Sequence, residues 1–372
     1  MTPRRSRLAQ ARRLVVKIGS STIVGASGSI DQRFLRDLAR QVAALRRQER
    51  RIVIVSSGAI AAGAERMRRK RIPRALSLSQ ASAAIGQSLL MGNYAAAFEA
   101  EGMCVAQILL TRADLGDRAR FVNALNTMEA LFSFGAVPIV NENDTVAVEE
   151  ITFGDNDTLA ALVCPLVRAD LLMLLSDVDG LYRDPEKRGE VVAEVTEVTA
   201  EIEALAGGAS GRVGRGGMRS KVNAARLAAR CGVPVLLANG REQDIVLRLL
   251  RGEPLGTYFH PVGSRLEGRK QWLALVGEVR GRLLVNEGAK RRVVQDGKSL
   301  LAVGIEAVEG HFERRAMVAL VGPGKEEFAR GMANYDSGSL RRVKGMRSSE
   351  RRRLLGEGPD EVVHRDNMVV WG

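Results

Sequence analysis

A glycine-rich segment that ends in a lysine is the strongest indication of a binding or catalytic site in this chain. The segment GRVGRGGMRSK runs from Gly211 to Lys221, and the helical run from Val222 to Arg230 follows it directly. Glycines let backbone N–H groups turn toward an anion, and a helix start adds its positive dipole end. The Lys221 ammonium can neutralise phosphate oxygens. The spacing fits neither common glycine-rich nucleotide fingerprint, so the segment is either a phosphate site of another kind or a flexible loop.

Two further segments place anion-binding groups at the ends of apolar runs. Lys17 stands near the end of RLVVKI and before Gly-Ser-Ser, where it either lies over a phosphate or is simply solvated. Ser56-Ser57-Gly58 follows RIVIV and opens a helix. A serine there caps the helix, and the same helix N-terminus can receive a carboxylate or a phosphate. The two roles are compatible.

Asparagine and aspartate are concentrated in two short clusters, Asn141 to Asp144 (NEND) and Gly154 to Asp157 (GDND). Loops often carry these residues for turn geometry alone. Together they also suit an amino acid ligand, because a carboxylate can pair with its ammonium and an amide can donate to its carboxylate. Paired carboxylates are equally typical of a metal site or of general acid–base chemistry.

A fourth polar strand end is Ser176-Asp177, which follows the apolar run LLMLL. It is either a simple turn or an acceptor for ribose and adenine groups.

The strands and helices that must position these polar groups alternate along the chain. Apolar runs predict strands at 13–18, 51–55, 103–110, 136–140, 171–175 and 233–237. Helical spacing predicts a helix capped by Asp31 and helices at 79–100, 118–134, 157–167, 218–230 and 243–251.

Continuous apolar strands that alternate with helices are typical of a mostly parallel α/β sheet covered on both faces. Ligands of such open sheets bind outside the carboxyl ends of the strands. The four polar strand ends are therefore expected to line one crevice.

The pattern changes after Gly256. The stretch Tyr258 to Gly268 contains Pro261 and two glycines and is typical of a linker. From Trp272 onward the apolar runs are short and punctuated by glycines, which predicts a separate, small, β-rich domain. We expect a first domain at 1–258, a linker at 259–275 and a second domain at 276–372.

Composition restricts the possible functions. The chain has 372 residues and a formal net charge of +13, which favours anionic ligands such as nucleotides and nucleic acid, although arginine bias explains much of it. Single cysteines without a C-x-x-C pair are typical of a reducing cytoplasm. The N-terminus has no apolar signal-peptide core, and no run is long enough to span a membrane. Three isolated histidines argue against histidine triads and histidine-rich metal sites.

These motifs, taken in order, resemble those of glutamate 5-kinases in the amino acid kinase superfamily. The resemblance rests on VVKIGSS, IVIVSSGAIAAG, QILLTRAD, PIVNENDTV, GDND, DGLY and GGMRSK and covers nearly the whole first domain. Later runs, GRLLVNEGAKRRVV, GKSLLAVGI and VHRDNM, are similar to a PUA domain. The resemblance implies a three-layer αβα sandwich around a mostly parallel open sheet, followed by a small PUA-like domain.

The same resemblance implies an activity, namely ATP-dependent phosphorylation of the γ-carboxylate of L-glutamate to L-glutamyl 5-phosphate, the first step of proline biosynthesis. It implies that Lys17 and Lys221 contact the transferring phosphoryl group and that Asp157 orients them. Glutamate is then bound by Ser57, Asp144 and Asn156, with Asn141 nearby. ATP is held by Lys17, Ser176, Asp177, Arg215, Gly216, Gly217, Met218, Arg219, Ser220 and Lys221. Mg²⁺ is expected to be held largely by the phosphates, without an assigned protein ligand.

The resemblance also implies feedback inhibition by proline, a homo-oligomer (dimer or tetramer) and a cytoplasmic location. Five residues depart from the family pattern: Arg215 and Arg219 replace small or hydroxyl residues, Asn286 replaces Asp, and Arg315-Ala316 replaces a Gly-Asp turn. The last two departures weigh against ligand binding by the PUA-like domain.

Two other interpretations compete. One is a kinase for acetylglutamate or aspartate, although the NEND and GDND clusters favour free glutamate. The other is an RNA-binding protein, suggested by the charge and the PUA-like domain. Against it, aromatic residues make up only 4% of the chain, and the first domain shows no aromatic stacking platform.

Overall fold

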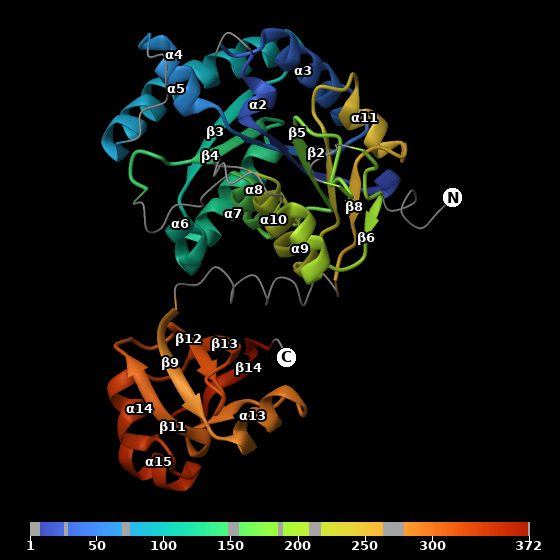
Figure 1. Cartoon of the computed structure of the whole chain (residues 1–372). Helices are drawn as coiled ribbons and strands as arrows, with labels where there is room; N and C mark the ends of the chain where they lie inside the picture. Colours follow the sequence, from blue (N-terminus) through green and yellow to red (C-terminus); the bar gives the residue numbers. More distant parts are fainter. Residues whose placement is uncertain are drawn as a thin grey trace. The chain divides into compact units, whose positions relative to one another are not determined.

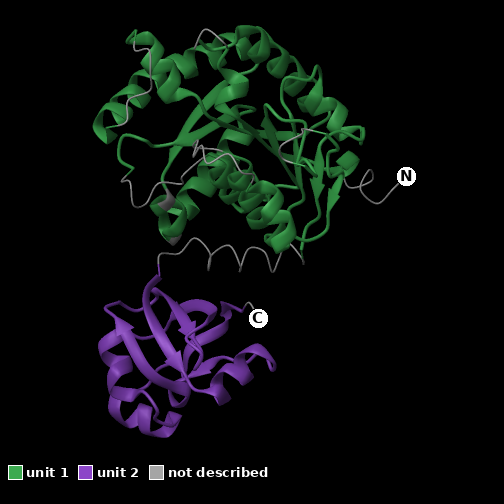
Figure 2. Ribbon diagram, viewed as in Figure 1, with its two compact units in different colours: residues 1–265 green, residues 266–372 purple. Residues whose placement is uncertain are grey.

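The computed structural model describes residues 8–25, 29–68, 75–147, 156–184, 189–207, 217–262 and 279–370. The chain divides into two compact units, residues 1–265 and 266–372 (Figure 2). Each unit has its own apolar core. One cluster of buried side chains is drawn from residues 8 to 258 of the sequence, and the other from residues 283 to 368.

The first unit is built on one eight-stranded sheet with the order β3-β4-β2-β1-β5-β7-β8-β6. All neighbouring strands are parallel except β7 and β8, which confirms the predicted mostly parallel sheet. The strands are β1 (Arg13–Ile18), β2 (Arg51–Ser56), β3 (Val105–Leu110), β4 (Val137–Glu142), β5 (Leu171–Ser176), β6 (Glu194–Val195), β7 (Val235–Asn239) and β8 (Thr257–Phe259). Central strands such as β5 are buried along their whole length, because helices cover both faces.

Helices form the two outer layers of this unit. Figure 1 shows α3, α5 and α11 on one face of the sheet and α7, α8 and α10 on the other, which confirms the three-layer arrangement. The helices are α2 (Ser20–Ile23), α3 (Gln32–Arg46), α4 (Ala59–Arg66), α5 (Leu76–Glu99), α6 (Arg112–Gly116), α7 (Arg118–Ser133), α8 (Asn156–Val167), α9 (Ala200–Ala206), α10 (Met218–Arg230) and α11 (Ile245–Leu250). Asp31 caps α3 as predicted, because its carboxylate accepts from the backbone N–H groups of Arg33 and Phe34.

One local prediction was wrong. Tyr258 and Phe259, at the start of the predicted linker, belong to β8, where both are buried and pair with β7. Two aromatic side chains that reach the core outweigh the turn signal of the proline and glycines after them. The remaining linker residues lie mostly outside the described part of the chain, so the domain borders stay predictions.

The second unit is β-rich, as predicted, and its sheet has the order β10-β14-β13-β12-β9-β11. The strands are β9 (Val279–Val285), β10 (Leu300–Leu301), β11 (Ile305–Gly310), β12 (Met317–Val321), β13 (Glu327–Ala333) and β14 (Glu361–Val370). It also contains helices that the sequence analysis did not predict: α13 (Glu287–Val294), α14 (Ser337–Val343) and α15 (Ser348–Leu355), besides the 3-10 turn η1 (Ala302–Gly304). Asn286 caps α13 through its side-chain oxygen, which accepts from Ala289 N at 2.8 Å.

Among the described residues, no helix is both long and apolar enough to cross a membrane.

Candidate active site

The carboxyl ends of four adjacent strands form the floor of the site. In the sheet order these strands are β4, β2, β1 and β5, which end at Glu142, Ser56, Ile18 and Ser176. They carry the four polar segments that the sequence analysis expected to share one crevice. Parallel strands present their carboxyl ends at one edge of the sheet, so the fold brings these segments side by side.

A buried ion cluster lies at the centre of this edge. Lys17 Nζ lies 2.5 Å from Asp157 Oδ1, and Lys221 Nζ lies 3.1 Å from Asp157 Oδ2. The Ser220 hydroxyl donates to the same Oδ2 at 2.8 Å. The Asp157 side chain is 0% exposed. Two ammonium groups thus meet at one buried carboxylate, and an anion beside them can contact both.

The ionisation of Asp157 follows from its surroundings. Burial alone raises the pKa of this carboxyl group, but the charges of Lys17 and Lys221 and the hydrogen bonds from Lys17 and Ser220 outweigh it, so the pKa is lowered. The group is therefore a carboxylate at neutral pH. It fixes the positions of both ammonium groups and does not act as a proton donor.

Three elements place these side chains. Lys17 lies in the buried strand β1, Asp157 in the first turn of α8, and Lys221 in the first turn of α10. Helices α8 and α10 pack against each other, so their N-terminal turns meet over the end of β1. The first turn of a helix stabilises a carboxylate through the helix dipole, which adds to the pairing of Asp157 with its lysines.

An amide cluster lies beside the ion cluster. Asn156 Nδ2 lies 2.9 Å from Ser56 O, 3.0 Å from Ser57 Oγ and 3.0 Å from Asn141 Oδ1. Asn156 thus contacts two other predicted glutamate-binding residues, Ser57 and Asn141. Asn156 directly precedes Asp157, so the same helix start serves both clusters.

Asp144, the fourth predicted glutamate residue, lies half-buried in the turn that follows β4. Gln80 of α5 holds this turn, because its Nε2 donates to Ala147 O at 3.0 Å. The turn is therefore anchored at the same sheet edge as the amide cluster.

Ser176 and Asp177 lie at the end of β5, next to β1. The Ser176 hydroxyl donates to Asp177 Oδ1 at 3.1 Å. Burial raises the pKa of Asp177, but hydrogen bonds from the backbone, Ser176 and Ser21 and the charge of Lys221 bring it below its usual value. Asp177 therefore lies within the electrostatic field of the ion cluster.

Comparison with known proteins decides the family. A model of the amino acid kinase family matches residues 12–239, and a PUA domain model matches residues 281–355. The glutamate 5-kinase of Moorella thermoacetica is 48% identical over the whole of both chains. That of Thermus thermophilus is 46% identical, with 97% of each chain covered. The chain belongs to the glutamate 5-kinase family.

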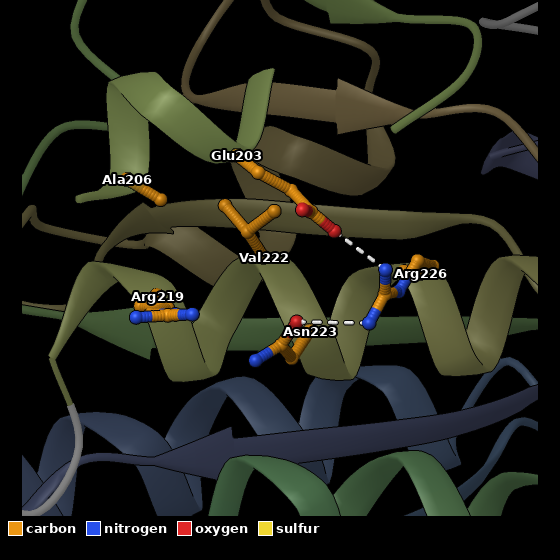
Figure 3. A pocket seen from close by; sticks show the side chains of 6 residues that line it. All are labelled: Glu203, Ala206, Arg219, Val222, Asn223 and Arg226. Atoms are coloured by element: carbon orange, nitrogen blue, oxygen red, sulfur yellow. Dashed lines mark hydrogen bonds and ion pairs between the residues drawn. The ribbon is translucent and has the colours of Figure 1, made fainter. Parts of the chain in front are cut away.

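The predicted ATP segment of this family member is only partly described. Arg215 and Gly216 lie outside the described residues. Gly217 directly precedes α10, and Met218 is its first residue. Arg219 is exposed and lines a hollow of about 190 Å³ between α9 and α10 (Figure 3). Two helix positions separate Arg219 from Lys221, a rotation of about 200°, so the two side chains leave the helix on opposite sides.

Sequence reasoning missed the contribution of α5 to the site. Gln87 Oε1 accepts from Asn141 Nδ2 at 2.9 Å, and the Tyr94 hydroxyl donates to Ser56 Oγ at 2.9 Å. Burial and the hydrogen bond to Ser56 act in opposite directions on the pKa of Tyr94, and burial prevails and raises it. A signal was present: Gln87 shares a helical face with the buried residues Leu90 and Tyr94.

Proposed function

We propose that this protein transfers the γ-phosphoryl group of ATP to the γ-carboxylate of L-glutamate, which forms L-glutamyl 5-phosphate and begins proline biosynthesis. The observation that carries the proposal is the pair of lysines on one buried carboxylate, beside an amide cluster suited to an amino acid. Family membership, over the full length of the relatives, supports the same reaction.

The reaction needs no general base in the protein. The glutamate side chain has a reference pKa of about 4.3, so the attacking oxygen is already ionised at neutral pH. The barrier comes from repulsion between this carboxylate and the phosphates. Catalysis then depends on positioning and on charge neutralisation.

Lys17 and Lys221 supply this neutralisation. Each ammonium group pairs with a different oxygen of the Asp157 carboxylate, so Asp157 holds the two groups at a fixed spacing. During the transfer, negative charge is present on the oxygens of the phosphoryl group. If both ammonium groups contact these oxygens, their attraction offsets the repulsion between the phosphoryl group and the attacking carboxylate. Because the lysines are already ordered by Asp157, little rearrangement is needed during the transfer.

Glutamate binding is assigned to the polar groups next to this centre. Ser57 and Asn156 offer a hydroxyl and amide groups at a helix start, and Asp144 offers a carboxylate for the ammonium group of the amino acid. Asn141 contacts Asn156 and supports its orientation. In this proposal the γ-carboxylate of a bound glutamate faces Lys17 and Lys221.

ATP binding is assigned to Ser176, Asp177 and the segment from Arg215 to Lys221, which meets the ion cluster at α10. Mg²⁺ is proposed to enter with the phosphates. Among the described residues no three histidine, cysteine or acidic side chains group together as a metal site, and Asp157 is engaged by two lysines. These residues do not form a cage for a cation, so no step is assigned to one.

Feedback inhibition by proline, assembly into a dimer or tetramer, and a cytoplasmic location are proposed on the family resemblance. The border between the linker and the second domain at 275 is proposed from the change of sequence pattern after Gly256, whereas a border at 258 is set aside because Phe259 belongs to β8.

The test is ATP turnover with a panel of acceptors, in which hydroxylamine traps the acyl phosphate as a hydroxamate. We expect hydroxamate with L-glutamate and little with N-acetylglutamate or aspartate. Product from either of those acids, but not from glutamate, would overturn the substrate assignment. Repeating the glutamate reaction with added proline tests the proposed inhibition.

A further inference from the structure

Side-chain amides form a continuous relay from α5 to the start of α8. Asn156 Nδ2 donates to Asn141 Oδ1 at 3.0 Å, and Asn141 Nδ2 donates to Gln87 Oε1 at 2.9 Å. Gln87 Nε2 then donates to Gln107 Oε1 at 3.4 Å. The relay links one surface of the first unit to the centre of the proposed glutamate site.

The directions of the Asn141 and Gln87 amides follow from one backbone group. The N–H of Glu142 donates to Asn141 Oδ1 at 2.9 Å, so this oxygen cannot exchange places with Nδ2. Asn141 Nδ2 must then point at α5, where it needs an acceptor. Gln87 supplies this acceptor with its oxygen, and its own Nε2 is satisfied by Gln107.

The amide of Asn156 is oriented in turn. Its Nδ2 faces three acceptors, namely Asn141 Oδ1, Ser57 Oγ and the backbone oxygen of Ser56. Its Oδ1 therefore points the other way, and within the described part of the chain this buried oxygen has no hydrogen-bond partner. A buried acceptor without a donor is unfavourable, and a ligand that brings a donor relieves the cost.

We propose that Gln87 is a positioning residue for substrate recognition, because it holds Asn141, and through it Asn156, with the Asn156 Oδ1 directed at the ammonium group of the bound amino acid. The identity of that amino acid rests on the proposed function. Ammonium groups are donors only, so an oriented amide oxygen accepts them and an amide turned by 180° rejects them.

The position of Gln87 fits this role. The residue is 9% exposed and lies on the buried face of α5, where an apolar side chain would satisfy packing. It does not reach Asn156 itself. Replacement by an apolar side chain of similar length leaves Asn141 Nδ2 without its acceptor, so the amide is no longer held on the α5 side and can tilt about the hydrogen bond from the Glu142 N–H.

The experiment compares Gln87→Met, which keeps the length but loses the acceptor, with Gln87→Glu, which keeps an acceptor oxygen. The KM for L-glutamate is measured together with the Ki of glutarate, a competitor that lacks the ammonium group. For Gln87→Met we expect the KM for glutamate to rise about 10- to 100-fold, the range for a lost hydrogen bond to a charged group. The glutarate Ki and the kcat at saturation should stay near wild type, and Gln87→Glu should stay close to wild type in all three.

The matched control is Asn93→Ala, which removes an amide of the same helix that is not a member of the relay: its Nδ2 donates to Leu89 O, and its Oδ1 accepts from Gln32 Nε2 of α3. It should leave the glutamate KM unchanged. If Gln87→Met does not fold, Gln107→Leu, at the exposed end of the relay, should give a smaller rise of the same selective kind.

Two results would overturn the inference. Equal changes in the glutamate KM and the glutarate Ki would show that the variant merely loosens the site. If the ratio of the glutamate KM to the glutarate Ki is unchanged in both Gln87→Met and Gln107→Leu, the relay does not orient Asn156. Failure of the proposed function is visible separately, because the wild-type protein would then form no glutamyl hydroxamate.

Discussion

At the scale of single residues, Asp157 is the centre of the candidate site. A carboxylate with 0% exposure is costly unless it is paired, and here it is paired twice, with Lys17 at 2.5 Å and Lys221 at 3.1 Å. The same pairing prevents the two like-charged ammonium groups from moving apart. A buried ion cluster of this kind at the carboxyl end of a strand is more typical of a functional site than of a stabilising contact.

Lys221→Ala tests this assignment. We expect kcat to fall by about 10²- to 10³-fold, the usual cost of losing one charge-stabilising donor in the transition state. The glutamate KM should change little, because ground-state binding is assigned to other groups. Steady-state kinetics with Arg230→Ala, at the far end of the same helix, provide the control. Normal turnover by Lys221→Ala would show that the start of α10 has no catalytic role.

Asp144→Ala is expected to act on binding instead. Removing the carboxylate proposed to pair with the substrate ammonium should raise the glutamate KM about 10-fold or more, with kcat at saturation retained. The KM for ATP should not move. A variant whose kcat falls while its glutamate KM is unchanged would contradict the assignment of Asp144 to substrate binding.

At the scale of elements, the approach of α4 to α5 depends on two glycines. A Cβ on Gly63 would lie 1.8 Å from Ser82 O, and one on Gly86 would lie 1.7 Å from Ala59 O. The two helices therefore touch backbone to backbone. Gly86 is also the neighbour of Gln87, so the close helix contact helps to determine how far the amide relay reaches toward Asn141.

Gly86→Ala is predicted to force the helices apart and lower the free energy of unfolding by about 2–3 kcal/mol. The matched control is Gly92→Ala in the same helix, where a Cβ would meet nothing within 4 Å. That change should raise stability by about 0.5–1 kcal/mol, because alanine favours the helix. Urea unfolding of both variants checks the contrast, and equal effects would contradict the close-contact argument.

At the scale of the whole molecule, the two units have separate cores. In the second unit the buried Arg351 binds Asp360 Oδ1 at 2.6 Å, and Arg352 binds the same oxygen through Nε at 3.0 Å. The Arg352 and Arg351 guanidinium groups lower the pKa of Asp360 to about 2. The sequence analysis disfavours RNA binding by this unit, and salt-dependent filter binding tests it.

Asp360→Asn should lower the unfolding temperature of the second unit at pH 7. A carboxyl group whose pKa is lower in the folded state stabilises above its unfolded pKa of about 3.9, and the contribution is lost as the pH falls toward 2. The difference between variant and wild type should therefore close between pH 4 and pH 2. Calorimetry measures both transitions, and glutamate turnover at pH 7 should be unchanged. An equal shift in both transitions would show that the units unfold together.

Much of this protein is determined by local sequence. Strand β1 and helix α10 have the predicted bounds, because continuous apolar runs and helical spacing depend on near neighbours. The family motifs identified the candidate site residues, because the polar residues that follow each strand are consecutive in the sequence. Helix α5 was also predicted from its alanine-rich pattern.

The tertiary structure alone decided which groups meet. Lys17 and Lys221 are far apart in the sequence, and only the sheet order and the packing of α8 on α10 bring both to Asp157. Gln87 was missed for the same reason: its acceptor role exists only because α5 lies against the end of β4. Hydrogen bonds and ion pairs act over a few ångströms in space, and sequence spacing does not specify such distances between elements.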